Sequence, residues 1–286
     1  MTQTPALNNS ILTFTCLDRA GIVYAVSGAI VAARGNILES QQYYSPETGR
    51  FFIRIQLEHD SDRGELEDCL APVAHRFQAQ ARVYEVGRPT RSLILVSTAP
   101  HCLNALLSRL TTGTLPIDVP LVLGNHPDLA ELAGFYGVPF EHHAVLPQTK
   151  ADVEARIRQL VDELDIELVV LARYMQILSP ELCGFLAGRA INIHHSFLPG
   201  FKGANPYRQA HARGVKLIGA TAHFVTADLD EGPIIEQSVT RVGHAKSVGQ
   251  LAEIGRDIES TVLTHAVRLF AERRLLLDGL RTVVFD

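Results

Sequence analysis

Residues 168–171 read Leu-Val-Val-Leu, a short apolar run without the alternating polar residues of a half-exposed strand. Such a run is typical of a parallel strand that is buried on both faces of its sheet. Similar runs occupy residues 93–96 and 119–123, and helical patterns lie between the runs at residues 103–110, 129–136 and 152–164. This alternation predicts a doubly wound, mostly parallel α/β fold, in which ligands bind at the carboxyl ends of the strands.

The same pattern continues towards the end of the chain. A strand begins at Ile191 and is followed by a helix, two strands and a long helix, predicted at residues 207–213, 217–225, 234–240 and 248–271. We therefore assign residues 88–286 to one α/β domain. Glycine and proline in residues 87–90 indicate a linker before it.

The first part of the chain has a different order of elements. Strands are predicted at residues 11–16, 37–44, 51–58 and 81–86, and helices at residues 18–33 and 66–77. The order βαββαβ is that of a ferredoxin-like domain, with helices on one face of an antiparallel sheet. We assign residues 1–87 to this domain. Alternation in residues 51–58 predicts a strand with one buried face, and Asp18 is expected to cap the first helix.

Composition excludes several classes of protein. Of the 286 residues, 47% are hydrophobic and 20% are charged, as in an ordinary globular protein, and a net charge of -5 argues against a nucleic-acid partner. No apolar run approaches the ~20 residues of a membrane span, and residues 1–10 lack a signal-peptide pattern. The four cysteines have no C-x-x-C spacing, which fits a reducing compartment. We expect a cytoplasmic protein that binds no membrane.

Residues 191–207 read I-N-I-H-H-S-F-L-P-G-F-K-G-A-N-P-Y and carry the first candidate site. Alternate residues of a strand face the same way, so Asn192 and His194 project from one side of the sheet. An amide and an imidazole can both donate to one oxygen, as in a carbonyl that gains negative charge when a nucleophile adds to it. Alternatively, both groups satisfy buried backbone. Pro199, Gly200 and Gly203 favour the first reading, because they predict a tight loop close to a ligand.

A second candidate stretch, residues 219–235, reads G-A-T-A-H-F-V-T-A-D-L-D-E-G-P-I-I. Its loop contains three acids, and a solvated loop is the default reading for at least two of them. Gly232 is followed by proline, so the turn is expected to hold Asp230 rigidly against the neighbouring strand. A partly buried carboxylate beside an imidazole is a reasonable general base for water.

Taken together, these motifs resemble the formyltransferase family that uses 10-formyltetrahydrofolate. The amino-terminal D-R-A-G-I-V, residues 18–23, is similar to the start of an ACT domain, and the combined resemblance covers nearly the whole chain. It implies that Asn192, His194 and Asp230 form the catalytic triad. It further implies supporting roles for Ser196 and His223.

The resemblance also implies a folate pocket. Residues 171–178, L-A-R-Y-M-Q-I-L, match the segment that lines this pocket in the family, and residues 227–232 match the loop that meets the pterin ring. The folate-binding residues implied in this way are Arg173, Met175, Gln176, Ile177, Leu178, Asp228, Glu231 and Gly232. Arg173 and Lys202 are surface charges by default, but they lie beside this pocket and could attract the glutamate tail of folate.

Water is the expected acceptor of the formyl group. Residues 96–104, V-S-T-A-P-H-C-L-N, stand where a related transferase has a glycine-rich phosphate loop, but they contain no glycine. His101 and Cys102 begin the presumed acceptor pocket, where a packed thiol is favoured over a nucleophile. Hydrolysis to formate and tetrahydrofolate is therefore predicted, with formate supplying purine synthesis. Transfer to an amine such as glycinamide ribonucleotide, or a non-catalytic amino-acid sensor, stays open.

No cofactor or metal is expected, because the twelve histidines show no H-E-x-x-H pattern. His195 is predicted to be structural, since its ring points to the opposite face of the strand from His194. Resemblance to ACT domains implies a homo-oligomer and a small amino-acid effector near Asp18, Arg19 and Gly21. The alternative is that this domain serves only for oligomerisation.

Overall fold

The computed structural model describes residues 7–200 and 206–286, so Lys202 and Gly203 lie outside the described residues. The chain divides into two compact units. The first unit consists of Met1–Arg88 and Arg273–Asp286, and the second of Pro89–Glu272. The division after Arg88 lies one residue from the expected boundary. Residues 273–286, which the sequence analysis assigned to the second domain, group with the first unit instead.

The first unit contains a four-stranded sheet in the order β2-β3-β1-β4, with every neighbouring pair antiparallel. Its elements are β1 (Asn8–Leu17), α1 (Ile22–Ala32), β2 (Gly35–Ser45), β3 (Arg50–His59), α2 (Arg63–Phe77) and β4 (Gln80–Glu85). Apolar side chains of the sheet, such as Leu12 and Phe14, pack with Ile30 of α1 and Leu66 of α2. The predicted ferredoxin-like order of elements is confirmed.

The prediction of one buried face for β3 is wrong. Phe52 is 0% exposed, although it lies on the face opposite Ile53, because a carboxyl-terminal hairpin covers it. This hairpin, β12 (Leu275–Asp278) and β13 (Arg281–Val284), packs Val283 against the Phe52 ring. Arg54 on the same face is 2% exposed and pairs with Glu39 at 3.1 Å. The strand is therefore buried on both faces.

The prediction that Asp18 caps the first helix is also wrong. The α1 helix begins at Ile22, and the residue before it is Gly21, whose φ of 94° is in the left-handed region that favours glycine. No side chain caps α1. The backbone N–H of Asp18 instead donates to the carbonyl oxygen of Gly49 at 2.8 Å. Asp18 therefore joins two loops of the first unit.

The second unit contains a seven-stranded sheet in the order β11-β10-β9-β8-β5-β6-β7. Strands β5 to β9 run parallel, whereas β10 and β11 are antiparallel to their neighbours. The strands are β5 (Thr90–Val96), β6 (Ile117–Gly124), β7 (Phe140–His142), β8 (Leu168–Leu171), β9 (Ala190–His194), β10 (Leu217–Phe224) and β11 (Ile234–Arg241). The helices are α3 (His101–Thr111), α4 (Ala130–Phe135), α5 (Lys150–Glu163), α6 (Pro180–Phe185), α7 (Pro206–Ala212) and α8 (Val248–Ala271).

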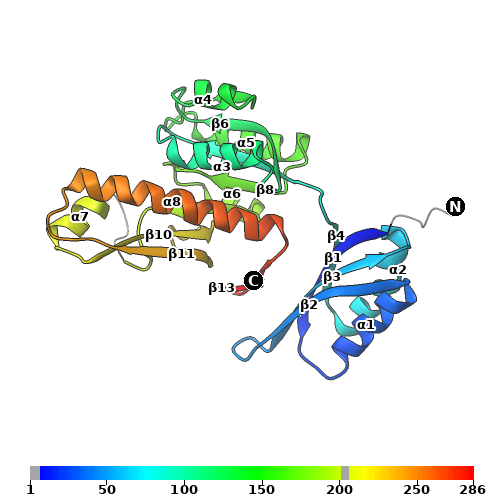
Figure 1. Ribbon diagram of the computed structural model, residues 1–286. Coiled ribbons are helices and arrows are strands. Elements are labelled where there is room, and N and C mark those ends of the chain that lie inside the picture. Colours follow the sequence, from blue (N-terminus) through cyan, green and yellow to red (C-terminus); the bar gives the residue numbers. More distant parts are fainter. Residues whose placement is uncertain (1–6, 201–205) are drawn as a thin grey trace. The chain divides into compact units, whose positions relative to one another are not determined.

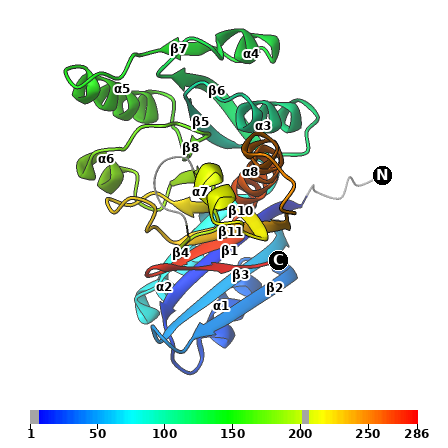
Figure 2. The ribbon, with the colours of Figure 1, turned by 90° about the vertical axis from the view of Figure 1, so that its left-hand side faces the viewer.

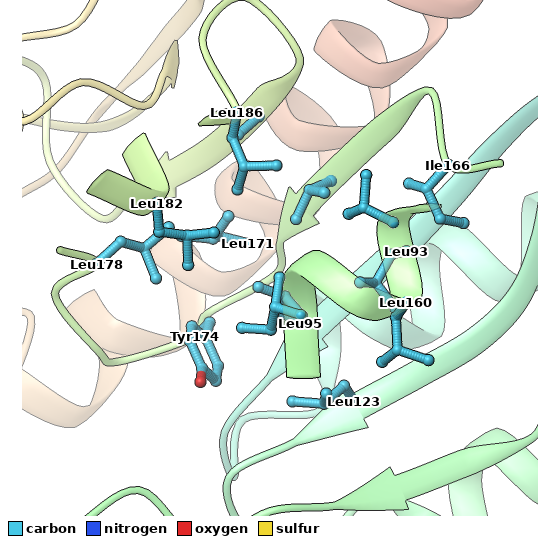
Figure 3. Close-up of a cluster of buried hydrophobic side chains, with 14 of the residues drawn as sticks. Leu93, Leu95, Leu123, Leu160, Ile166, Leu171, Tyr174, Leu178, Leu182 and Leu186 are labelled. Atoms are coloured by element: carbon cyan, nitrogen blue, oxygen red, sulfur yellow. The ribbon is translucent and has the colours of Figure 1, made fainter. Parts of the chain in front are cut away.

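Helices cover both faces of this sheet, with α3 and α8 on one side and α5 and α6 on the other (Figures 1 and 2). Every second residue of a parallel strand faces the same layer of helices. Leu93, Leu95 and Leu171 accordingly pack with Leu160 of α5 and Leu182 of α6 (Figure 3). The continuous apolar runs of the sequence are therefore strands buried on both faces, and the predicted doubly wound fold is confirmed.

No helix in the described part of the chain is both long and apolar enough to cross a bilayer.

Candidate active site

The site begins where β9 and β10 pair. In their antiparallel register Asn192 lies opposite His223, and His194 lies opposite Thr221. Residues that lie opposite each other in an antiparallel pair project from the same face of the sheet. The Asn192 side chain therefore meets the His223 ring, with Asn192 Nδ2 3.2 Å from His223 Nε2.

The His223 ring fixes how the Asn192 amide is oriented. His223 Nδ1 lies 2.9 Å from the carbonyl oxygen of Phe224, which only accepts, so Nδ1 carries the proton. In the neutral ring Nε2 is then an acceptor, and Asn192 donates one N–H to it. The second N–H of the same amide is available to a ligand.

Asp230 reaches this face from the loop between β10 and β11. Its φ is 57°, a left-handed backbone conformation that is costly for a residue other than glycine. Glycine at position 232 lets the loop approach the end of β10 closely, because a Cβ at this position would lie 1.7 Å from the carbonyl oxygen of Phe224. The Phe224 N–H also donates to the carbonyl oxygen of Pro233 at 2.9 Å. The loop is therefore pressed against the end of β10.

Asp230 Oδ1 lies 3.2 Å from His194 Nδ1 and 3.7 Å from His223 Nε2. Burial opposes ionisation of this carboxyl, but its contacts, above all the hydrogen bond with His194 Nδ1, outweigh burial and lower the pKa of Asp230 below its usual value. His194 Nε2 is buried and has no hydrogen-bond partner among the described residues. Asn192, His194, His223 and Asp230 form what we name the strand-end cluster.

Ser196 lies outside this cluster and stabilises the loop that follows β9. Its hydroxyl donates to the carbonyl oxygen of Gly200 at 2.8 Å. Thr221 Oγ1 donates to the Ser196 carbonyl oxygen at 2.9 Å and accepts from the Leu198 N–H at 3.0 Å. These bonds hold the described part of the loop to β10.

The strand-end cluster faces a cavity of about 980 Å³ within the second unit. Its lining includes most of the residues implied for folate binding, namely Arg173, Met175, Gln176, Ile177, Leu178 and Asp228, together with His101. Glu231, Gly232, Ser196 and Cys102 are not among the lining residues. Met175, Ile177 and Leu229 are more than half exposed although they are apolar, so one side of the cavity is an apolar surface open to a ligand.

A second group of polar side chains lines the same cavity, and two of its members, Tyr207 and Glu259, were not predicted as site residues. Glu259 of α8 is 1% exposed and accepts from Tyr207 Oη at 2.6 Å and from His101 Nε2 at 2.8 Å. Arg173 Nε lies 3.4 Å from the same carboxylate. We name Glu259, His101, Tyr207 and Arg173 the Glu259 network.

The network has consequences for several earlier expectations. Arg173 is only 16% exposed and is paired with Glu259, so it is not a surface charge. Cys102 is 0% exposed, and burial, followed by the nearby Glu259 carboxylate, raises its thiol pKa. Such a thiol is a poor nucleophile, which favours the packed reading. His195 is 9% exposed, and burial, with a further contribution from Arg173, lowers its pKa to about 4.

His101, Cys102 and Glu259 place three potential metal-ligand atoms within 4.8 Å of one another. Their surroundings do not fit a metal ion well. Arg173, a cation, lies against the same carboxylate oxygen that His101 contacts, and the Cys102 thiol is held in its protonated form. A metal would need the thiolate and would be repelled by the guanidinium.

The sequence contains a pattern that predicts the burial of Glu259. Leu251, Gly255, Glu259 and Val262 follow the spacing of the buried face of a helix, so the acid falls on an apolar stripe. A carboxylate on such a face needs a partner. His101, from α3, was predicted to begin the acceptor pocket, but no local pattern links it to Glu259 or identifies Tyr207 of α7 as a partner.

Comparisons with known proteins identify the family to which this chain is similar. Residues 90–267 match the formyl transferase family. A formyltetrahydrofolate deformylase from a Corynebacterium species is 47% identical over 96% of this chain and 97% of its own length. The crystal structure of a formyltetrahydrofolate deformylase from Burkholderia mallei is 49% identical, covers 98% of this chain and 100% of that one, and has a TM-score of 0.94. Glycinamide ribonucleotide transformylase 1 from Symbiobacterium toebii, 33% identical with a TM-score of 0.66, covers 71% of this chain and 97% of its own.

Proposed function

Because this chain belongs to the formyltetrahydrofolate deformylase family, we propose that it hydrolyses 10-formyltetrahydrofolate to formate and tetrahydrofolate. One observation carries the proposal: Asn192, His194 and Asp230 converge at one cavity that has an apolar wall. We refer to these three residues as the catalytic trio. An apolar wall suits the flat pterin and aryl rings of a folate, and the trio suits the reacting formyl group.

In the proposed reaction the trio surrounds the formyl group on N10. Asp230 is ionised at neutral pH because its pKa is lowered, so it accepts a hydrogen bond from water and orients the attack on the formyl carbon. A carboxylate with a lowered pKa is a weak base, so orientation is the larger part of its role. As the carbon–oxygen bond forms, the Asp230 carboxylate takes the proton that the water loses, and this proton balances the one that N10 gains when its bond to carbon breaks.

The two donors of the trio stabilise the negative charge that develops on the formyl oxygen. One is the second N–H of Asn192, and the other is His194 Nε2 when it carries a proton. Losing one such donor typically costs roughly 10²–10³ in rate. The intermediate then collapses as the bond between carbon and N10 breaks and N10 takes up a proton. No cofactor enters this sequence, because water is the only co-substrate.

His223 is proposed to position the trio rather than to touch the substrate. Its Nδ1–H is held by the Phe224 carbonyl oxygen, and its Nε2 accepts from Asn192. A rotated Asn192 amide would present its oxygen to the ring and lose this bond. Asn192 is thereby favoured in the orientation that directs N–H groups towards the formyl oxygen.

The remaining expectations concern the role of the protein in the cell. We propose that it acts in the cytoplasm and supplies formate for purine synthesis. We also propose that the first unit joins chains into a homo-oligomer and binds a small amino acid near Asp18, Arg19 and Gly21. A four-stranded antiparallel sheet with two helices supports this proposal as a fold compatible with ACT domains.

A direct test is incubation of the purified protein with 10-formyltetrahydrofolate in the absence of any amine. Formate, measured with a coupled formate dehydrogenase, is expected to accumulate in step with tetrahydrofolate. If formyl transfer requires added glycinamide ribonucleotide, the protein is a transferase instead. If neither condition releases tetrahydrofolate, the sensor reading replaces the enzyme.

A further inference from the structure

The Glu259 network has no task in the proposed hydrolysis, yet it lines the same cavity as the catalytic trio. A single ring separates the two groups. The His195 ring centroid lies 5.2 Å from that of His194 and 6.1 Å from that of Tyr207. A nucleophile larger than water that approached the formyl carbon from this side would therefore meet Tyr207 and Glu259.

Within the network, donors outnumber acceptors. The Glu259 carboxylate already receives Tyr207 Oη and His101 Nε2 and faces the Arg173 guanidinium. Two Arg173 nitrogens, Nε and Nη1, are buried without a hydrogen bond among the described residues, although Nε lies 3.4 Å from the Glu259 carboxylate. An amine acceptor would bring further N–H donors, which would have to compete with Tyr207, His101 and Arg173 for the Glu259 carboxylate. Burying such unpaired donors is unfavourable.

Tyr207 also fills space. Its ring crosses α8 at Gly255, where a Cβ would lie 1.9 Å from the Tyr207 hydroxyl oxygen. The α7 helix packs beside α8 (Figures 1 and 2), and glycine at this one position lets the phenol reach Glu259 one turn further along. Burial and the Glu259 carboxylate raise the pKa of Tyr207, which keeps the phenol protonated and donating. The ring is held in the cavity by both contacts.

We propose that the Glu259 network excludes amine acceptors from the formyl carbon and so restricts the reaction to water. Tyr207 occupies the space beyond the His195 ring on this side of the cavity, and an amine would have to displace the network's own donors to reach the Glu259 carboxylate. This inference rests on the proposed function, because it explains why a formyl donor site would use water alone.

The test measures how the formyl group is divided between two products. The protein is incubated with 10-formyltetrahydrofolate and excess glycinamide. Formate is measured by formate dehydrogenase and N-formylglycinamide by mass spectrometry. In the second product, the amine nitrogen bonds to the formyl carbon, the bond to N10 breaks, and N10 takes up the proton that the amine loses. The ratio of the products does not depend on the total rate, so it can be read in a weakened variant.

Two variants open the space by different means. Tyr207→Ala removes the ring, whereas Gly255→Ala pushes the ring aside and keeps every polar group of the network. Gly243→Ala is the matched control, because a Cβ there meets nothing within 4 Å. We expect both opened variants to raise the ratio of N-formylglycinamide to formate about tenfold or more over wild type, as for other changes of pocket size. The control should match wild type.

Three results would overturn the inference. The first is an unchanged ratio in both opened variants while they still release formate. The second is abundant N-formylglycinamide from wild type. The third is loss of formate release in both variants although their melting temperatures are near that of wild type, because the network would then serve the chemistry itself. Formate release by wild type without glycinamide separately tests the proposed function.

Discussion

The strand-end cluster and the Glu259 network use the same chemical groups in one cavity but arrange them differently. Both contain a buried carboxylate that contacts imidazole nitrogens, and in both the carboxyl pKa is lowered although burial opposes this. For Glu259 the lowering comes from His101 together with Arg173 and Tyr207. Asp230 stands on a left-handed turn at the end of a strand, whereas Glu259 lies in the middle of a long helix. On its turn, Asp230 lines the cavity where a ligand can contact it. Tyr207 and His101 donate to the Glu259 carboxylate and lie between it and a ligand.

The comparison teaches that a carboxylate–imidazole contact does not by itself identify catalytic groups. In the strand-end cluster His194 Nε2 remains for the substrate, and the cluster can respond when charge develops. In the Glu259 network Arg173 already balances the acid, and the network's own donors contact both carboxylate oxygens. The following predictions break or sharpen this difference.

Asp230→Asn is expected to have the largest effect. It removes the charge that orients water and holds His194, so kcat should fall by about 10²–10⁴, the range for a lost acid–base group. Tetrahydrofolate affinity, measured by calorimetry, should change little. Asp257→Asn, at an exposed position of α8, is the control and should retain wild-type turnover. Near-normal formate release from Asp230→Asn would remove this residue from the mechanism.

Gly232→Ala tests whether the turn, rather than the carboxylate alone, makes the difference. A Cβ at this position meets the Phe224 carbonyl oxygen at 1.7 Å, so the loop must move away from β10. Moving a reacting group by about 1 Å can cost roughly 10² in rate, and we expect a loss of kcat of that order. The control is Gly243→Ala, which should keep wild-type activity. Equal activity in the two variants would contradict a rigid turn.

His195, the ring between the two groups, is expected to govern part of the acid stability. Its folded-state pKa of about 4 lies below the unfolded value of about 6.5. Between these two values the unfolded chain binds the proton and the folded chain does not, so stability falls as pH drops from about 6.5 to 4. The loss from this residue is on the order of 3 kcal/mol. His195→Gln should have a melting temperature that depends less on pH over this window, and an equal dependence would rule out the assignment.

Chelation should have the smallest effect. Because Arg173 already balances the carboxylate that a metal would need, treatment with EDTA should leave both formate release and melting temperature unchanged. Loss of activity that added Zn²⁺ restores would instead assign His101, Cys102 and Glu259 to a metal site.

Local patterns were sufficient to predict the fold of the second unit. Leu168–Leu171 and Val248–Ala271 occur with the predicted bounds, because continuous burial and helical spacing leave direct traces in a sequence. The α6 helix was missed because it is short, although Ser179 accepts from the Leu182 N–H as a cap and Pro180 follows it. The missed β7 strand has only three residues, too few for alternation to be read.

Interactions between distant residues could not be predicted from local patterns. Asn192 and His223 lie in stretches that were both singled out, but their contact depends on the register of β9 and β10. Tyr207 was interpreted as part of a helix start, since nothing near it in the sequence indicates Glu259. Phe52 was expected on an exposed face, because the hairpin that covers it is more than 220 residues away in the chain, at residues 275–284.

Residues 273–286 belong to the first unit although they follow the second unit in the chain, and this order affects biosynthesis. Chains are made from the amino terminus, and domains generally fold as units during synthesis. The ribosome releases the whole second unit before it supplies the strands that shield the Phe52 side of the first sheet. Until residues 275–284 have been made, a nascent chain therefore leaves Phe52 uncovered, and a chain truncated after Glu272 would keep Phe52 as an apolar side chain open to chaperones or aggregation.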